Sequence, residues 1–291
     1  MTDLSTRAGR LSYLLRSGFV GMTTLRHLPR RERRQVRRAF LALKARAAVA
    51  AVLFPERPAA RQQVLGLQLT SADSYLDFDY LFEEMFIRRP YDVLPPSDEP
   101  MTVVDCGANI GMATAFFVRQ FPAATVIAFE PDPLTFDQLR RNVEANGMSQ
   151  VELHPVALGR ENTLGTLADP NHIMNSQRQH VLANGSAPGG PGAVEIRKLS
   201  EILGDRRVDL LKLDVEGAEL DILRDLESSG SLERVQNIVA EVDHEPKSPD
   251  GHMPEFLKML ERNGFSYQVD TLERRLVELG VRQQLLVRAY R

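Results

Sequence analysis

The sequence predicts an α/β protein: a mostly parallel sheet with an antiparallel C-terminal edge, preceded by an N-terminal helical extension. From residue 101 onward, short apolar segments alternate with segments of helical periodicity, which is typical of βαβ units. The last two strand-like segments, "FSYQVD" and "QQLLVRAYR", have no long helix between them, which favours antiparallel pairing there. Before residue 60 the chain is rich in arginine and has a helical repeat of apolar residues.

The elements follow in order along the chain. We expect strands at 101–105, 125–130, 150–154, 208–213 and 236–242, and helices at about 111–121, 133–146, 217–228 and 253–263. A Gly/Pro/Ser-rich part, "ANGSAPGGPGA", interrupts this rhythm. We therefore expect a long loop on the substrate side of the protein at 162–198.

The N-terminal segment is strongly basic. Residues 1 to 61 contain thirteen arginines and Lys44 against three acidic residues, a net charge of +11, which leaves −14 for the rest because the whole chain carries −3. In residues 28–54, Val36, Phe40, Leu43 and Ala47 recur at helical spacing. We expect this helix to cover the acidic body or to form a homo-oligomer contact. Binding to nucleic acid or to an anionic membrane surface is the alternative.

Three regions follow from these patterns. We expect a basic helical extension at 1–60, a connecting segment that packs on the core at 61–100, and the catalytic domain at 101–291. No apolar stretch reaches the ~18–20 residues of a membrane span, and no signal peptide pattern is evident. The single cysteine, Cys106, fits a reducing compartment, so a cytoplasmic location is expected.

The segment "VVDCGANIGM", residues 103–112, is a strand that ends on Asp105 and a glycine turn. Glu130 ends the next expected strand, twenty-five residues after Asp105, where an acid can bind ribose hydroxyls. The turn lacks the third glycine of dinucleotide sites, and Asp105 would repel a phosphate. An acid here suits a ligand with positive charge, which favours S-adenosylmethionine over NAD.

Three sequence motifs, taken together, are typical of one known protein family. D-x-G-A-N-x-G occupies Asp105–Gly111, A-F-E-P occupies Ala128–Pro131, and K-x-D-x-E-G-x-E occupies Lys212–Glu219. With these motifs the chain resembles the FkbM family of methyltransferases over roughly residues 101 to 270. The resemblance implies a class I methyltransferase (Rossmann-like) sheet, with S-adenosylmethionine bound across the carboxyl ends of the strands.

The resemblance also implies cofactor-binding residues. The glycine turn would surround the methionine end, Glu130 would hold the ribose, and residues farther along would border the adenine. The cofactor-binding residues expected in this way are Asp105, Gly107, Ala108, Asn109, Gly111, Glu130, Pro131, Asp132 and Ala157.

Methyl transfer to a hydroxyl requires alignment with the methyl group and removal of a proton. The catalytic candidates are Asp214, Glu216 and His244, which follow strands four and five; histidine titrates near neutrality. His172 and His180 are weaker alternatives, and Glu219 is expected to serve structure. Asp214, Glu241 and Asp243 could gather magnesium, but nothing in their spacing demands a metal, so none is assigned.

Three function classes stay open, of which a nucleotide-binding dehydrogenase or a binding-only module is disfavoured by the missing glycine pattern; the other two are as follows. The first is O-methylation of a hydroxyl on a small molecule, natural product or sugar, as the resemblance implies. The second is a nucleic-acid methyltransferase that uses the basic helix. We expect a small-molecule or sugar acceptor and no nucleic-acid partner, because aromatic residues that could stack on bases are nearly absent from the basic segment.

Overall fold

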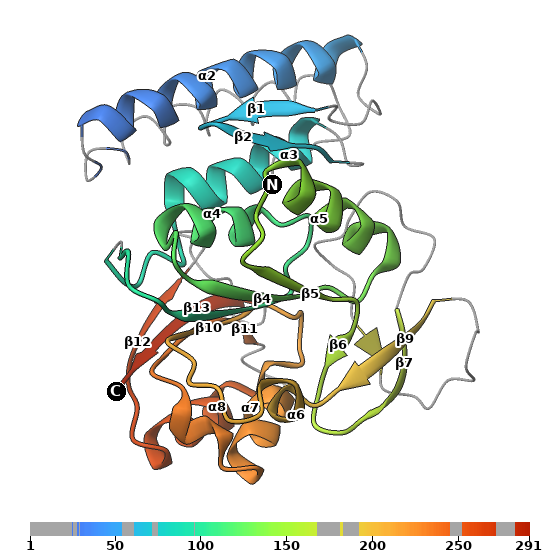
Figure 1. Cartoon of the computed structure of the whole chain (residues 1–291), viewed down its shortest axis with the longest axis vertical. Helices are drawn as coiled ribbons and strands as arrows, with labels where there is room; N and C mark the ends of the chain where they lie inside the picture. Colours follow the sequence, from blue (N-terminus) through green and yellow to red (C-terminus); the bar gives the residue numbers. More distant parts are fainter. Residues whose placement is uncertain are drawn as a thin grey trace.

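The protein has a central twisted sheet with helices on both faces and a long helix across one end (Figure 1). A computed structural model describes residues 25, 28, 30–53, 61–71, 75–95, 97–167, 181–182, 192–244, 252–271 and 283–291. The element bounds below refer to this part of the chain.

The main sheet has seven strands in the order β12-β13-β11-β10-β3-β4-β5. They are β3 (Thr102–Cys106), β4 (Thr125–Phe129), β5 (Val151–His154), β10 (Leu210–Leu213), β11 (Asn237–His244), β12 (Ser266–Thr271) and β13 (Gln283–Tyr290). The five strands from β11 to β5 are parallel, and β13 is antiparallel to both its neighbours. This is the class I methyltransferase arrangement, and the expected antiparallel C-terminal edge is confirmed. β13 lies inside that edge, and β12 is the outermost strand.

Helices cover the two faces of the sheet separately (Figure 1). α4 (Met112–Gln120) and α5 (Pro133–Ala145) lie on one face; α6 (Leu199–Leu203), α7 (Glu219–Ser228) and α8 (His252–Arg262) lie on the other. A short 3₁₀ turn, η4 (Ser231–Arg234), leads into β11. Each face has its own buried core, with Phe117 and Leu139 in one, and Leu223 and Phe256 in the other. The strands and helices predicted from 101 onward agree with these bounds to within two residues.

The segment expected to be one long loop, 162–198, contains strands, so that expectation is corrected there. A second, four-stranded sheet has the order β6-β9-β7-β8, formed by β6 (Ala157–Leu158), β7 (Thr163–Leu167), β8 (Val181–Leu182) and β9 (Ala193–Arg197). In β9, Val194 and Ile196 are buried and alternate with exposed Glu195 and Arg197. Such alternation is the pattern of a half-buried strand, and the buried pair forms a small core with Leu167. Residues 168–180 and 183–191 lie outside the described residues.

The N-terminal helix, α2 (Arg30–Leu53), buries the predicted apolar face, since Val36, Phe40, Leu43 and Ala47 are all buried. It packs on α3 (Tyr75–Phe82) and on the π-helical turn η2 (Glu83–Arg88), beside a hairpin of β1 (Gln62–Val64) and β2 (Leu67–Leu69). These residues share one core with those of α4. The helix is therefore integral to the fold of its own chain.

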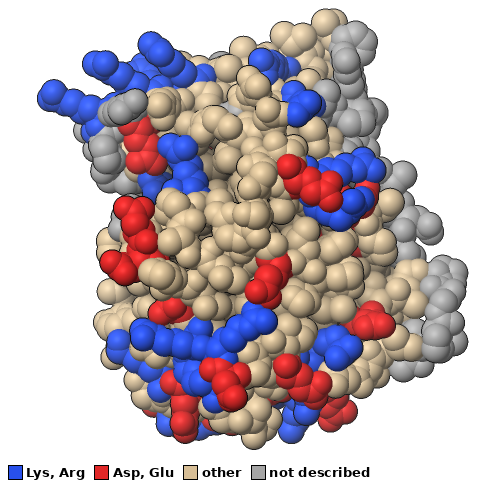
Figure 2. Space-filling view, in the orientation of Figure 1, with Lys and Arg blue, Asp and Glu red and all other residues tan. Residues whose placement is uncertain are grey.

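A buried lysine fixes this helix. The Lys44 Nζ lies 2.5 Å from Asp79 Oδ2 and 3.1 Å from Glu83 Oε2. On the outer side, Arg30, Arg34, Arg37 and Arg38 are exposed, and Figure 2 shows basic side chains gathered over this end of the molecule. Among the described helices, none combines the length and the apolar character that crossing a membrane requires.

Candidate active site

The glycine turn after β3 joins the ends of three strands. Gly107 and Ala108 donate backbone hydrogen bonds to the Phe129 carbonyl at the end of β4, at 3.1 and 2.8 Å. A Cβ on Gly107, which has φ +79°, would lie 1.8 Å from the Asp214 carbonyl oxygen after β10. The glycine is therefore required by the contact between this turn and β10. Gly111, with φ +87°, begins α4 where a Cβ would lie 2.7 Å from Leu139 Cδ1.

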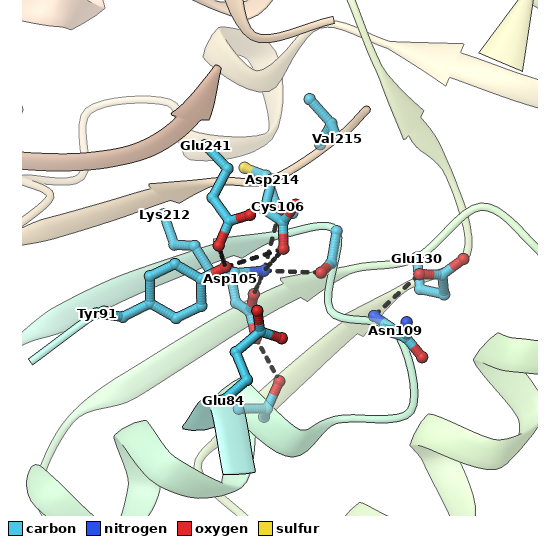
Figure 3. Close-up of polar contacts among 12 residues, drawn as sticks. Glu84, Tyr91, Asp105, Cys106, Asn109, Glu130, Lys212, Asp214, Val215 and Glu241 are labelled. Atoms are coloured by element: carbon cyan, nitrogen blue, oxygen red, sulfur yellow. Dashed lines mark hydrogen bonds and ion pairs between the residues drawn. The ribbon is translucent and has the colours of Figure 1, made fainter. Parts of the chain in front are cut away.

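Glu130 lies against this turn, at the position expected for the ribose acid (Figure 3). It is 8% exposed and accepts hydrogen bonds from the backbone N–H groups of Asn109 and Asp132, both at 2.9 Å. Burial raises the pKa of Glu130 to about 7. A carboxylate has further lone pairs beyond these two bonds, so Glu130 retains the capacity to accept from ligand hydroxyls.

The other residues expected near the cofactor have roles in the fold. Asp132 is the N-cap of α5 and accepts from Thr135 N at 2.7 Å, and Pro131 before it is half-buried. Ala108 is buried in the core on the α4 side. Ala157 begins β6 and is buried in the core of the small sheet.

Asp105 points into the protein. It has no exposed surface, and its two oxygens accept from Lys212 Nζ at 2.9 Å and from Thr114 Oγ1 at 2.7 Å. Lys212 Nζ also donates to the Gly107 carbonyl at 2.8 Å. Asp105 therefore forms an internal ion pair beneath the turn. Asp105 would affect a ligand only indirectly, through the position of Lys212 and of the turn.

A cluster of acids surrounds Lys212 on the side away from Glu130 (Figure 3). Asp214, whose side chain is 29% exposed, directly follows β10, and its Oδ2 lies 3.5 Å from Lys212 Nζ. The Tyr91 hydroxyl lies 3.0 Å from this Asp214 oxygen and 2.6 Å from Glu241 Oε1. The other Glu241 oxygen accepts from Gln284 Nε2 at 2.8 Å. We call Glu84, Tyr91, Lys212, Asp214 and Glu241 the acid cluster.

Electrostatics within the acid cluster follow from its burial. Burial raises the pKa of Glu241 well above its ordinary value, and the charge of Asp214 adds to this. Burial, with Asp214 again, raises the pKa of Glu84 to about 7. Burial alone would lower the pKa of Lys212, but Asp105 and Asp214 beside it raise that pKa overall. Lys212 therefore stays charged.

The structure describes the side chains of only some of the catalytic candidates. Asp214 is in the acid cluster, and Glu216 is half-buried in the following turn with φ +56°. His244 ends β11 opposite Gln283, but its side chain is not among those described, and His172 and His180 lie outside the described residues. Glu219 accepts from Val215 N and Gly217 N and holds the turn before α7, the structural role expected for it.

Tyr91 and Glu84 were missed by sequence reasoning. They precede the first motif by more than ten residues, and "RRPYD" matches no catalytic pattern. In the structure, Glu84 belongs to η2, which is π-helical, and this form is frequent at functional sites.

In the described part of the chain, no group of three or more His, Cys, Asp or Glu side chains could hold a metal ion, and the side chain of Asp243, the third magnesium candidate, lies outside that part. The nearby Asp214 and Glu241 oxygens instead meet at one tyrosine hydroxyl.

Comparison with known proteins identifies the family. The family model described as the Methyltransferase FkbM domain matches residues 105–267, more than half of the chain. The chain belongs to the FkbM methyltransferase family. It is therefore an S-adenosylmethionine-dependent methyltransferase.

Three curated relatives give the range of similarity. "Methyltransferase 1" of Beauveria bassiana is 33% identical over 214 residues, which is 67% of this chain and 84% of that protein. "31-O-demethyl-FK506 methyltransferase FkbM" of Streptomyces tacrolimicus is 29% identical, over 64% of this chain and 81% of that protein. "2-O-methyltransferase NoeI" of Sinorhizobium fredii is 27% identical, over 42% of this chain and 55% of that protein.

The residues present fit S-adenosylmethionine. Glu130 offers carboxylate oxygens beside the turn, as ribose hydroxyls need, and the turn lacks the glycine spacing that admits a pyrophosphate. Lys212, Asp105 and Asp214 together add an excess of one negative charge beside the turn, which suits a cationic sulfonium.

Proposed function

We propose that this methyltransferase methylates a hydroxyl oxygen on a small molecule, natural product or sugar, with Asp214 as the proton acceptor. The observation that carries the proposal is the position of Asp214. It is a partly exposed carboxylate at the carboxyl end of β10, directly against the glycine turn. The relatives named for a 31-O-demethyl substrate and for 2-O-methylation support an oxygen acceptor.

S-adenosylmethionine supplies a methyl group activated by a sulfonium. In the proposed mechanism, Glu130 would hold the ribose, and the turn from Gly107 to Gly111 would surround the methionine end. Asp214 would take the proton of the acceptor hydroxyl, while the methyl–sulfur bond of the donor breaks with its electron pair left on sulfur, as in S-adenosylhomocysteine. Lys212 and Tyr91 hold the Asp214 carboxylate in place.

The remaining site assignments are also proposals. Ala108, Asn109, Pro131, Asp132 and Ala157 would shape the cofactor site through the backbone they fix, and Asp105 would act through Lys212. His244, at the end of β11, is the second candidate for the base, and Glu216 is a candidate for contact with the acceptor.

A screen of hydroxylated acceptors with methyl-labelled S-adenosylmethionine tests the reaction. With any acceptor found, Asp214→Asn should lower kcat by roughly 10²–10⁴-fold, because a general base is lost. Asp221→Asn, on the exposed side of α7, is the matched control and should leave kcat unchanged. Full turnover by Asp214→Asn together with inactivity of His244→Ala would transfer the base role to His244.

A nucleic-acid acceptor is the second candidate, because Arg30, Arg34, Arg37 and Arg38 are exposed on one helix. Methyl transfer to RNA or DNA that falls steeply with salt would establish it. A cytoplasmic location remains a proposal from the single Cys106. Homo-oligomerisation through α2 also remains a proposal, and it would use the exposed Leu41, Val49 and Leu53.

A further inference from the structure

The Tyr91 hydroxyl lies between two carboxyl groups. Its oxygen is 2.6 Å from Glu241 Oε1 and 3.0 Å from Asp214 Oδ2, both within hydrogen-bond range. A phenol hydroxyl carries one proton, and an ionised carboxylate carries none. Only one of the two contacts can therefore be a bond donated by Tyr91, and the other needs a proton from a carboxyl group.

Glu241 is the better holder of that proton. It is 6% exposed, whereas the Asp214 side chain is 29% exposed and lies 3.5 Å from the Lys212 ammonium. Glu241 Oε2 accepts from Gln284 Nε2, as the carbonyl oxygen of a neutral acid can, which leaves Oε1 to carry the proton. Burial raises the pKa of Glu241 well above its ordinary value, which agrees with this assignment.

We propose that Glu241 is a neutral carboxylic acid in the resting enzyme, that it donates to Tyr91, and that Tyr91 in turn donates to Asp214. Glu241 and Tyr91 are then positioning residues. Their chain of two hydrogen bonds directs a proton at Asp214 Oδ2, which orients the carboxylate and presents Oδ1 to the acceptor hydroxyl. The catalytic part of this inference rests on the proposed function of Asp214.

Tyr91 comes from outside the part of the chain that matches the family domain, which begins at residue 105. It follows Arg89, a residue with φ +52°, in a conformation that costs energy for a side chain with a Cβ. Arg89 is held by ion pairs to Asp92 at 3.0 Å and to Glu32 of α2 at 3.4 Å, and it stacks on Phe116. The N-terminal region thus fixes the backbone that carries Tyr91 into the site.

The protonation of Glu241 can be measured without any acceptor. Infrared difference spectra of wild type against Glu241→Gln report the carbonyl band of a protonated carboxyl. The spectra should be taken above the pKa of about 7 that burial gives Glu84, Glu130 and Glu219, so that these groups are ionised. The protonated band should be present in wild type and absent in Glu241→Gln. Glu144→Gln, at an exposed position of α5, is the control and should retain it.

Activity tests the positioning role. Glu241→Gln should keep kcat within a few-fold of wild type, because an amide can also donate to Tyr91 and accept from Gln284. Tyr91→Phe should lower kcat by roughly 10- to 100-fold, the effect of one lost hydrogen bond to a charged group. Glu241→Ala should lower kcat by a similar factor, because it leaves the buried Tyr91 hydroxyl and the Gln284 amide without their partner. Affinity for S-adenosylhomocysteine should not change.

Two results would overturn the inference. One is the absence of the protonated band in wild type. The other is a Glu241→Gln variant as inactive as Glu241→Ala, which would make Glu241 an ionised base. A protonated Glu241 in an enzyme whose Asp214→Asn variant is fully active would overturn the base role of Asp214 and leave the proton assignment standing.

Discussion

The two halves of the site are built in different ways. The proposed cofactor half, the Gly107–Gly111 turn with Glu130, comes from two adjacent strands and is made mostly of backbone contacts. In the proposed acceptor half, the acid cluster, the Tyr91 hydroxyl meets partners 123 and 150 residues away in sequence. Short motifs can encode the first kind of site, because the residues that form it lie close together in sequence. Only the complete fold assembles the second.

Lys212 joins the two halves. Its ammonium group donates to Asp105 and to the Gly107 carbonyl on the cofactor side, and it lies 3.5 Å from Asp214 on the acceptor side. Its side chain is 2% exposed, so it balances the charge of a fully buried Asp105. Substitutions at Lys212, at Gly107 and at Glu130 therefore distinguish effects on the stability of both halves from effects on one half alone.

The largest effect on stability is expected from Lys212→Met. Removing one partner of a buried ion pair leaves Asp105 charged and unpaired, so the free energy of unfolding should fall by about 3–5 kcal/mol. Urea unfolding monitored by circular dichroism measures it. Lys258→Met, at an exposed position of α8, should change it by no more than about 0.5 kcal/mol. An Asp105→Asn/Lys212→Met double variant should recover part of the loss, and equal losses in both variants would argue against the ion pair as the cause.

The next effect concerns the contact between the two halves. Gly107→Ala would place a Cβ 1.8 Å from the Asp214 carbonyl oxygen, at φ +79°. The clash and the backbone strain together should cost about 2–4 kcal/mol and should also displace Asp214. Gly147→Ala has a positive φ but nothing within 4 Å, so it should cost only the strain, about 1–2 kcal/mol. Equal thermal stability of the two variants would show that this contact is not tight.

The smallest effect is confined to the cofactor half and depends on pH. Burial raises the pKa of Glu130 from 4.5 to about 7, so the folded state binds its proton more tightly than the unfolded state does. The stabilisation is complete below pH 4.5 and is lost as the pH rises through about 7. Across this pH window, the free energy of unfolding of Glu130→Gln should therefore fall by roughly 1–3 kcal/mol less than that of the wild type. An unchanged slope would contradict the burial argument.

Sequence reasoning predicted the main sheet well because each strand and helix carries its own periodicity. The same reasoning placed Glu130 beside the turn, since both positions follow adjacent parallel strands. It did not reveal the ion pair of Asp105, because a sequence does not show that a buried lysine on β10 will reach that carboxylate. The small sheet was missed although Val194 and Ile196 alternate with polar residues, because the Gly/Pro-rich stretch before them favoured a loop.

The acceptor half could not be predicted in the same way. Asp214 and Glu241 were candidates because the sequence placed both near the ends of expected strands, but their shared partner Tyr91 lies in a segment without a motif. The helix periodicity of Val36, Phe40 and Leu43 predicted a buried face, and nothing in it indicated that Glu32 of the same helix would pair with Arg89 next to Tyr91. Contacts of this range depend on tertiary packing.

Calorimetric titration with S-adenosylhomocysteine tests the division of the site into two halves most directly. Glu130→Ala should weaken binding strongly, and Tyr91→Phe should bind as wild type does while its methyl transfer falls. NAD should give no heat of binding with any of the three proteins. Loss of S-adenosylhomocysteine binding in Tyr91→Phe, or unchanged binding in Glu130→Ala, would contradict the account.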